Sequence, residues 1–272
     1  MHIPSSNRFL ANMRAGRVEN FYSLGNHATP RHVDFVCNTG LFDTLWFDLE
    51  HFDISADRLA VLNMVAKAYP VTTLARMRAT DYKTVMQVLE SGVGGIICSM
   101  VDSAEEAEAI VRWARFNNPK PGQGEATGQR GWNGGGVDAQ YGNMAAADYV
   151  AHQNRETAIL CQVETETALA RIDDIVAVKG VDGIFFGPGD YAHQIGRLGQ
   201  IGHVDVLSAM GKVAASCKRH GKIWGTLGVG REMYEKVKAL GAGFISPGGD
   251  VRVMNLGIRE LAKTFQPPAP GA

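Results

Sequence analysis

The sequence lacks the features of a nucleic-acid-binding, membrane-spanning or disulfide-stabilised protein. Lysine and arginine (27) nearly balance aspartate and glutamate (28), giving a net charge of −1, and no basic cluster favours nucleic acid. Residues 1–16 carry arginines but no continuous apolar segment, so we expect neither a signal peptide nor a membrane span. The four cysteines are widely spaced and form no Cys-x-x-Cys pair, which favours a reduced, cytoplasmic setting.

Glycine motifs that bind nucleotide phosphates are also absent. No Gly-x-Gly-x-x-Gly follows the first predicted strand, which weakens the nucleotide-binding form of an open α/β sheet. The run Gly134-Gly135-Gly136 lacks the lysine and Ser/Thr pair of a phosphate-binding loop. It belongs to a long polar segment, residues 117–141, that we interpret as a functional or mobile loop rather than a linker.

What the sequence does contain is a regular alternation of short apolar runs with amphipathic helical patterns. The predicted strands are residues 21–24, 44–51, 71–77, 95–101, 157–164, 183–190, 222–227 and 243–246. Eight strands alternating with helices predict an α/β protein with a (β/α)8 barrel, and a doubly wound open sheet is the alternative. We expect one domain over residues 1–265, ending in a helix from 251 to 265, and a disordered tail at 266–272.

Polar residues follow several of the predicted strands. In a barrel the carboxyl ends of all strands reach one rim, so these residues can be grouped before any function is assumed. They are Asp48, Glu50, His51, Arg76, Glu164, Asp190 and Asp250. Glu164 and Asp190 follow neighbouring strands and could share a divalent cation, because such ions prefer all-oxygen sites. On spacing alone, both acids could instead cap helices.

Three other rim features each allow a functional and a structural interpretation. Arg76 could bind a substrate carboxylate with its planar guanidinium, or pair structurally with Asp48 or Glu50. His51 could transfer protons near neutral pH while Asp48 holds one tautomer, or it could be an ordinary loop residue. Gly187-Pro188-Gly189 could present backbone N–H groups to an anion at a helix start, or form a tight turn.

Three segments, in this order, resemble the signatures of the HpcH/HpaI aldolases, which are metal-dependent class II pyruvate aldolases. They are Phe47-Asp48-Leu49-Glu50-His51, Gln162-Val163-Glu164-Thr165 and Gly187-Pro188-Gly189-Asp190, and Gly128-Gln129-Arg130-Gly131 resembles a fourth motif. The resemblance runs from about Asn7 to Phe265. It implies a TIM barrel of the phosphoenolpyruvate/pyruvate type.

The resemblance implies a metal and substrate site. Glu164 and Asp190 are expected to hold Mg²⁺, Mn²⁺ or Co²⁺, which would chelate pyruvate and act as a Lewis acid for its enolate. Gln162, Gly187, Gly189 and Asp190 are expected to bind substrate. Backbone N–H groups at Gly189 and Asp190 would receive the pyruvate carboxylate.

The remaining catalytic roles also come from the resemblance. Arg76 is expected to stabilise the enolate oxygen, and His51, oriented by Asp48, to relay the proton of the aldol hydroxyl. The implied reaction is reversible aldol cleavage of a 4-hydroxy-2-oxo acid to pyruvate and an aldehyde. Alternatives are an oxaloacetate-type decarboxylase, a lyase like the citrate lyase β-subunit, and a non-catalytic keto-acid sensor. Family members are typically hexamers, built as trimers of dimers that exchange the last helix.

The sequence also departs from the family pattern. Met77 and Ser99 stand where proline is common, and Glu90 stands where an aspartate from a neighbouring subunit usually approaches the site. The segment from Trp132 to Gly136 is unlike the common form. These departures leave the predicted metal and enolate residues intact, and they leave the identity of the aldehyde open.

Overall fold

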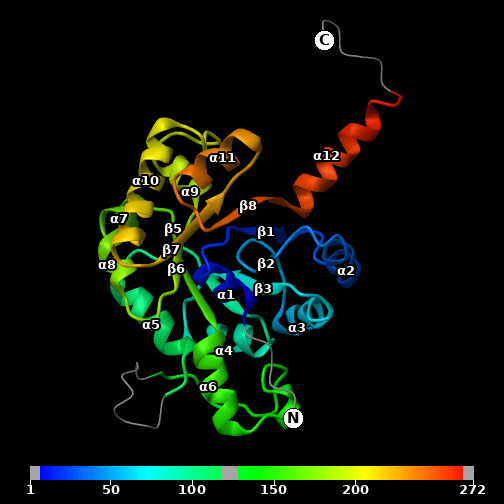
Figure 1. Cartoon of the computed structure of the whole chain (residues 1–272), viewed down its shortest axis with the longest axis vertical. Helices are drawn as coiled ribbons and strands as arrows, with labels where there is room; N and C mark the ends of the chain where they lie inside the picture. Colours follow the sequence, from blue (N-terminus) through cyan, green and yellow to red (C-terminus); the bar gives the residue numbers. More distant parts are fainter. Residues whose placement is uncertain (1–6, 118–127, 266–272) are drawn as a thin grey trace, which may run out of the picture.

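The computed structural model describes residues 7–117 and 128–265, and eight parallel strands form its centre (Figure 1). The strands are β1 (Glu19–Leu24), β2 (Thr44–Asp48), β3 (Thr72–Met77), β4 (Gly95–Cys98), β5 (Ala158–Val163), β6 (Gly183–Phe186), β7 (Ile223–Leu227) and β8 (Phe244–Gly249). Each strand pairs with the next in the chain, and β1 pairs with β8 to close the barrel. This closure confirms the predicted (β/α)8 barrel and excludes the open sheet.

Helices alternate with the strands, and most of them cover the outside of the barrel (Figure 1). Those in the described residues are α1 (Arg8–Arg14), α2 (Pro30–Asn38), α3 (Ala56–Ala66), α4 (Tyr82–Glu90), α5 (Ala104–Ala114), the 3₁₀ turn η1 (Gln140–Gly142), α6 (Ala146–Glu156), α7 (Glu166–Ala170), α8 (Ile172–Ala177), α9 (Pro188–Gln194), α10 (Val204–Arg219), α11 (Arg231–Ala239) and α12 (Asp250–Ala262). None of these helices has the length and apolar character needed to cross a membrane. The tail predicted at 266–272 lies outside the described residues.

Three predicted strands end several residues earlier than the apolar runs suggested. The run over 95–101 is a strand only to Cys98, and the other two end where polar residues begin. The run over 44–51 is a strand only to Asp48, because the Asp48 carboxylate accepts the backbone N–H of Glu50 (3.1 Å) and turns the chain. The run over 183–190 stops at Phe186, because Pro188 begins α9. Both corrections move polar residues from the strands into the short segments that follow them, which is where the barrel rim lies.

The strands separate two apolar layers. The inner layer fills the barrel with large side chains such as Phe21, Trp46, Phe185 and Phe244, while the outer layer lies between the strands and the helices. Helix α1 contributes to the inner layer through Phe9, whose ring packs edge-on against Phe21 and Phe244. Strands buried on both faces are typical of parallel sheets, and this explains the continuous apolar runs in the sequence.

The period of a β-strand determines which polar residues reach the interior at the rim. Side chains alternate between the two faces of a strand, so a residue two positions after an interior apolar residue faces the interior too. Trp46 is followed in this way by Asp48, and Leu74 by Arg76. Leu160 is followed by Gln162 at the end of β5. The barrel therefore changes from apolar to polar towards the carboxyl ends of its strands.

Candidate active site

Glu164 is a buried carboxylate held by neutral donors. It directly follows β5 and is 1% exposed. Its Oε1 accepts the backbone N–H of Met100 (2.9 Å), and its Oε2 accepts the side-chain N–H of Gln162 (2.6 Å). Thr165, and not Glu164, caps helix α7, so the capping interpretation of Glu164 is wrong.

The surroundings of Glu164 disfavour its charge. Burial raises the pKa of the Glu164 carboxyl to about 7, and the charges of Glu50 and Asp190 act in the same direction. The hydrogen bonds from Gln162 and Met100 oppose this shift without cancelling it. A buried carboxylate near two other acids, with no cation bonded to it in the described residues, is a group that a bound cation would stabilise.

Two backbone features adapt the chain to this carboxylate. Gly187 lies beside Glu164, where any Cβ would clash with the Oε2 atom. Met100 adopts a left-handed conformation (φ 54°) at the end of the β4 segment, and its N–H reaches Glu164. Non-glycine residues rarely adopt such angles, and they concentrate at functional sites. Gly187 was expected to bind substrate, and neither its contact with Glu164 nor the role of Met100 was predicted from the sequence.

The residues near Glu164 fit a hard cation. Asp190 is exposed in the first turn of α9, where no side chain caps the helix, and it lies near enough to influence the pKa of Glu164. The Gln162 Oε1 is buried without a hydrogen-bond partner in the described part of the chain. That part contains no group of three or more His, Cys, Asp or Glu residues arranged to hold a metal. Two carboxylates nevertheless suffice for Mg²⁺, which usually keeps several waters.

Arg76 is fixed in place by three neighbours. Its Nε donates to Asp48 Oδ1 (3.0 Å), its Nη2 donates to Asp48 Oδ2, and its Nε lies 3.4 Å from Glu50 Oε2. Its guanidinium also stacks on the Trp46 ring, 4.8 Å from the ring centre. The structural pairing that we considered for Arg76 is therefore present, and it holds the planar cation at the barrel mouth.

His51 lies at the edge of this group. Its side chain is 57% exposed, and its Nε2 is 3.9 Å from Glu50 Oε2. We expected Asp48 to orient the His51 ring, but in the described residues Asp48 bonds to the His51 backbone and not to its ring. The Asp48 carboxylate bonds to Arg76 and to the backbone N–H groups of Glu50 and His51, so its oxygens are already used. Glu50 is the carboxylate nearest to the imidazole.

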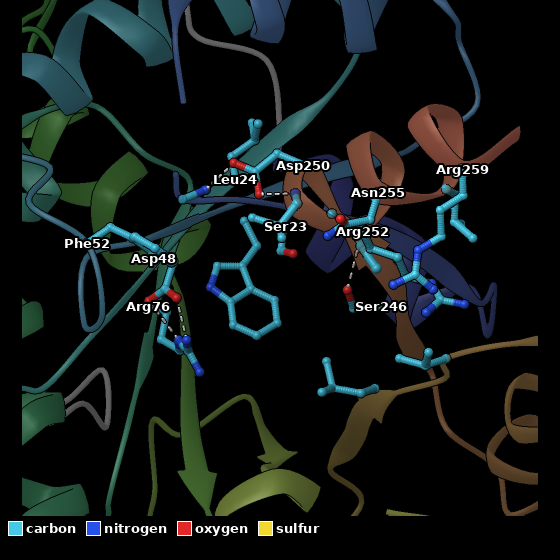
Figure 2. Close-up of a pocket in the computed structure, with 18 residues that line it drawn as sticks. Ser23, Leu24, Asp48, Phe52, Arg76, Ser246, Asp250, Arg252, Asn255 and Arg259 are labelled. Atoms are coloured by element: carbon cyan, nitrogen blue, oxygen red, sulfur yellow. Dashed lines mark hydrogen bonds and ion pairs between the residues drawn. The ribbon is translucent and has the colours of Figure 1, made fainter. Parts of the chain in front are cut away.

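A cavity of about 590 Å³ opens beside Arg76 and Asp48. It extends across the barrel mouth to the start of α12, and Figure 2 shows Asp48 and Arg76 on one side and Arg252 and Arg259 on the other. Asp250 also lines it, but its Oδ2 accepts the backbone N–H groups of Gly25 (2.9 Å) and His27 (2.7 Å). Asp250 thus joins the loop after β1 to α12.

The polar loop after α5 is anchored in its described part. Arg130, from the motif Gly128-Gln129-Arg130-Gly131, forms a buried ion pair with Asp138 (2.7 Å), and Tyr149 donates to the same carboxylate. The Gly131 N–H donates to the Tyr82 hydroxyl (2.7 Å). These contacts are structural, and the expected function of residues 118–127 lies outside the described residues.

Sequence reasoning missed four groups that shape the site. From the sequence, Trp46 was identified only as a strand residue, and Met100 only as part of the fourth predicted strand. Arg252 and Arg259 read as part of the last helix. Two patterns could have identified the missed side chains: Trp46 precedes Asp48 by two positions on a strand, and Arg252 and Arg259 are seven residues apart, on one face of a helix.

Comparison with known proteins gives consistent results over almost the whole chain. The profile of the HpcH/HpaI aldolase/citrate lyase family matches residues 25–255. A hydroxypyruvate/pyruvate aldolase from Pseudomonas aeruginosa is 32% identical over 98% of this chain and 96% of its own length. A 5-keto-4-deoxy-D-glucarate aldolase from Klebsiella pneumoniae is 30% identical over 83% of this chain and 84% of its own. The crystal structure of an HpcH/HpaI aldolase/citrate lyase family protein from Burkholderia cenocepacia superposes with a TM-score of 0.87 and 25% identity, covering 95% and 99% of the two chains.

Proposed function

The chain belongs to the HpcH/HpaI aldolase/citrate lyase family, and on this basis we propose that it is a divalent-metal-dependent pyruvate aldolase. The family supports an aldolase or lyase acting on pyruvate-type substrates. Within that class we propose reversible cleavage of a 4-hydroxy-2-oxo acid to pyruvate and an aldehyde. The proposal depends mainly on one observation. Glu164 is a buried carboxylate with no cationic partner in the described residues, on the same rim as Asp190 and Arg76.

Glu164 and Asp190 would hold the metal. Bound Mg²⁺, Mn²⁺ or Co²⁺ would supply Lewis acidity to the keto oxygen of pyruvate. The two acids come from the ends of adjacent strands, β5 and β6, and each lies in the field of the other. Gln162 would orient Glu164 through its 2.6 Å hydrogen bond, and Gly187 would leave the space that this carboxylate needs.

The first turn of α9 would bind the pyruvate carboxylate. The N–H groups of Gly189 and Asp190 have no partner within a new helix, and the start of a helix carries a partial positive charge. Gly189 has open space where a side chain would stand, so a small anion can approach its backbone.

Arg76 would stabilise the negative charge that develops on the enolate oxygen. Its bonds to Asp48 and its contact with Trp46 fix the guanidinium before substrate arrives. A donor that is already in position does not need to reorganise during the reaction, which makes it effective. Asp48 therefore acts through Arg76 as a positioning residue.

His51 would move the proton of the aldol hydroxyl. Its exposed imidazole can reach a substrate hydroxyl at the rim, and Glu50, 3.9 Å away, can stabilise the imidazolium that forms. In the cleavage direction His51 takes the hydroxyl proton as the carbon–carbon bond breaks. It returns the proton to the aldehyde oxygen in the synthetic direction.

We also propose that the chain is a homo-oligomer, a hexamer in keeping with the family resemblance. Met254, Ile258 and Leu261 form an apolar stripe along α12, and each is at least 45% exposed. The helix extends away from the barrel (Figure 1). An exposed apolar stripe of this kind suits a contact with another copy, through exchange of α12. The four cysteines are free and buried, which supports the proposed reduced, cytoplasmic setting. The one closed barrel supports the proposed single domain over residues 1–265.

The test is exchange of the pyruvate methyl protons in heavy water, followed by NMR. Metal-stripped protein is compared with protein to which Mg²⁺ or Mn²⁺ has been restored. We expect exchange only with metal, because enolate formation labilises these protons. No exchange with any divalent metal would remove the proposal. A panel of aldehydes, run beside oxaloacetate, then separates aldol addition from decarboxylation.

A further inference from the structure

Two buried polar atoms at neighbouring strand ends have no hydrogen-bond partner among the described residues. They are the hydroxyl oxygen of Ser99 and the side-chain carbonyl oxygen of Gln162, Oε1. Ser99 is 3% exposed and Gln162 is 1% exposed. Leaving a buried polar group unpaired costs free energy, so native structures retain few such groups, and each of them needs an explanation.

The register of β4 and β5 brings these two residues to the same place on the inner face of the barrel. Ile97 pairs with Leu160, and both belong to the inner apolar layer. Two positions further along each strand stand Ser99 and Gln162, so both side chains face the interior. The Ser99 N–H donates to Met77 O (2.9 Å), which continues the strand pairing of β4 as far as Ser99. The two side chains are therefore neighbours across the β4–β5 ladder.

The partner that Gln162 Oε1 needs is a hydrogen-bond donor. The Nε2 atom of the same amide donates to Glu164 Oε2 (2.6 Å), whereas Oε1 can only accept. The Ser99 hydroxyl can donate by rotating about its C–O bond, and the side chain can point in three directions through its staggered rotamers. The two unpaired groups are therefore chemically complementary.

Trp46 is another inner-layer donor without a partner among the described residues, since its Nε1 is buried and unpaired. It stands on β2, whereas β5 has β4 as its neighbour on that side of the barrel. The Arg76 guanidinium lies 4.8 Å from the centre of its ring, and Phe185 meets the ring edge-on at 5.0 Å, so the indole is fixed in place. The Ser99 hydroxyl, on the adjacent strand and able to rotate, is the donor better placed for Gln162.

A donor at Oε1 determines which way the Gln162 amide points. If the amide turned over, Oε1 would face the Glu164 carboxylate, and two acceptors would repel each other. A hydrogen bond at Oε1 stabilises only the orientation in which Nε2 is directed at Glu164. The Met100 N–H already holds the other carboxylate oxygen (2.9 Å). Fixing the amide therefore fixes the carboxylate from both sides.

We propose that Ser99 is a positioning residue for Glu164. Its hydroxyl donates to Gln162 Oε1, directly or through one shared water, and the amide then holds the carboxylate in the position that a cation needs. This inference rests on the proposed function, which places the metal at Glu164 and Asp190. Ser99 stands where the family pattern commonly has proline, which carries no hydroxyl, so this support belongs to this chain's own sequence.

The experiment measures the Kd for Mn²⁺, by electron paramagnetic resonance, in a double-mutant cycle of Ser99→Ala and Gln162→Met. Ser99→Ala should raise this Kd about threefold to tenfold, since one neutral hydrogen bond behind the ligand is lost. In the Gln162→Met background the same substitution should change Kd by less than about 1.5-fold, because the amide through which Ser99 acts is absent. Gln162→Leu serves as a second apolar replacement. Ser216→Ala, which removes a buried hydroxyl bonded to Asp173 (2.6 Å) on the outer side of the barrel, is the matched control and should leave Kd unchanged.

Two outcomes would overturn the inference. An unchanged Kd in Ser99→Ala would mean that the hydroxyl does not support the ligand, and equal weakening in both Gln162 backgrounds would mean that it does not act through the amide. Pyruvate proton exchange separates the two proposals. If the wild type binds Mn²⁺ and exchanges pyruvate protons while Ser99→Ala matches it in Kd, the aldolase stands and only this inference fails. If the expected differences in Kd appear but the wild type exchanges no pyruvate protons, the role of Ser99 stands and the aldolase proposal fails. A wild type that binds no Mn²⁺ would remove both.

Discussion

The two sides of the barrel mouth differ in charge, burial and origin. On the β5–β6 side, Glu164 is 1% exposed and bonded only to neutral donors, in the field of two more acids. On the β8–α12 side, Arg252 and Arg259 are exposed and lack acidic partners in the described residues. The first side gathers negative charge at a buried carboxylate, and the second carries two exposed positive charges.

The difference in origin matters more than the difference in charge. Residues of the first side stand at strand ends, where the barrel packing and its two-residue period determine their direction. The residues of the second side stand on α12, which extends away from the barrel and packs little against the core (Figure 1). Substitutions on the exposed part of α12 should therefore disturb the fold less than substitutions at Glu164 or Arg76, which stand in the packed rim.

The largest effect is expected for Glu164→Gln, which keeps the shape of the side chain and removes its charge. Metal-dependent pyruvate exchange should fall at least about a hundredfold, because a ligand worth several kcal/mol of charge stabilisation is lost. Titration with Mn²⁺, followed by electron paramagnetic resonance, should show weakened binding. The metal-free variant should melt no lower than the wild type, since the substitution removes a buried charge.

The contrary result for Glu164→Gln is clear. Full exchange together with unchanged Mn²⁺ affinity would show that the β5–β6 side is not the metal site. The two sides of the barrel mouth would then no longer differ in the way described above. Glu166→Gln, in the exposed first turn of α7, is a control that should leave both measurements unchanged.

Arg76→Lys comes next. Lysine keeps the charge but cannot form the two-pronged contact with Asp48 or stack on Trp46 in the same way. We expect kcat to fall roughly tenfold to a hundredfold with a smaller change in KM, because the interaction is needed mainly in the transition state. Steady-state kinetics with pyruvate and one aldehyde measure both constants. Arg112→Lys, in an exposed pair with Glu108, should be silent. A change in KM alone would mean that Arg76 only binds substrate.

The order and type of the strands were predictable because each buried parallel strand is a continuous apolar run. The rim position of residues such as Glu164 and Arg76 was predictable because they stand at the carboxyl ends of those runs. The contacts within the site could not be predicted from the sequence where a side chain has several possible partners within reach. Asp48 stands beside His51 in the sequence, yet in the structure it binds Arg76 from the neighbouring strand. Its use of the His51 backbone instead of the ring depends on that competition.

The position of α12 relative to the cavity could not be predicted for a different reason. Arg252 and Arg259 have the spacing of an exposed helix face, and exposed arginines are common. Their relation to the cavity depends on Gly248 and on the angle at which α12 leaves β8, neither of which is encoded in a local pattern. A sequence pattern identifies which residues share one face of a helix. The surface or cavity that this face contacts is known only from the three-dimensional structure.

Ile258→Glu should act on the assembly rather than on the chemistry. Placing a charge in the apolar stripe of α12 should weaken contact with another copy, so that light scattering reports a smaller particle. Ile258 does not line the cavity, and the neighbouring Arg259→Ala provides a control on its other face. Exchange of pyruvate protons should fall by less than about threefold, since the residues of the β5–β6 side come from one chain. An unchanged particle size would contradict the proposed role of α12.

The smallest effect concerns His32, which stands on α2 and shares a 3.0 Å hydrogen bond with Tyr22 of β1. Burial lowers the pKa of His32 more than the charge of Asp250 raises it. The unfolded chain therefore binds this proton more readily than the folded one. The contribution of His32 to stability is present above its ordinary pKa of 6.5 and is lost as the pH falls below that value.

Glu164 acts in the opposite sense in the metal-free protein. Its folded pKa of about 7 lies above the ordinary 4.5, so its contribution to stability is lost as the pH rises through 7. Thermal melts should therefore be recorded in the Glu164→Gln background, where this opposing contribution is removed. There, His32→Gln should flatten the decline in melting temperature between pH 7 and pH 5. An equally steep decline in both proteins would mean that His32 is not a source of acid sensitivity.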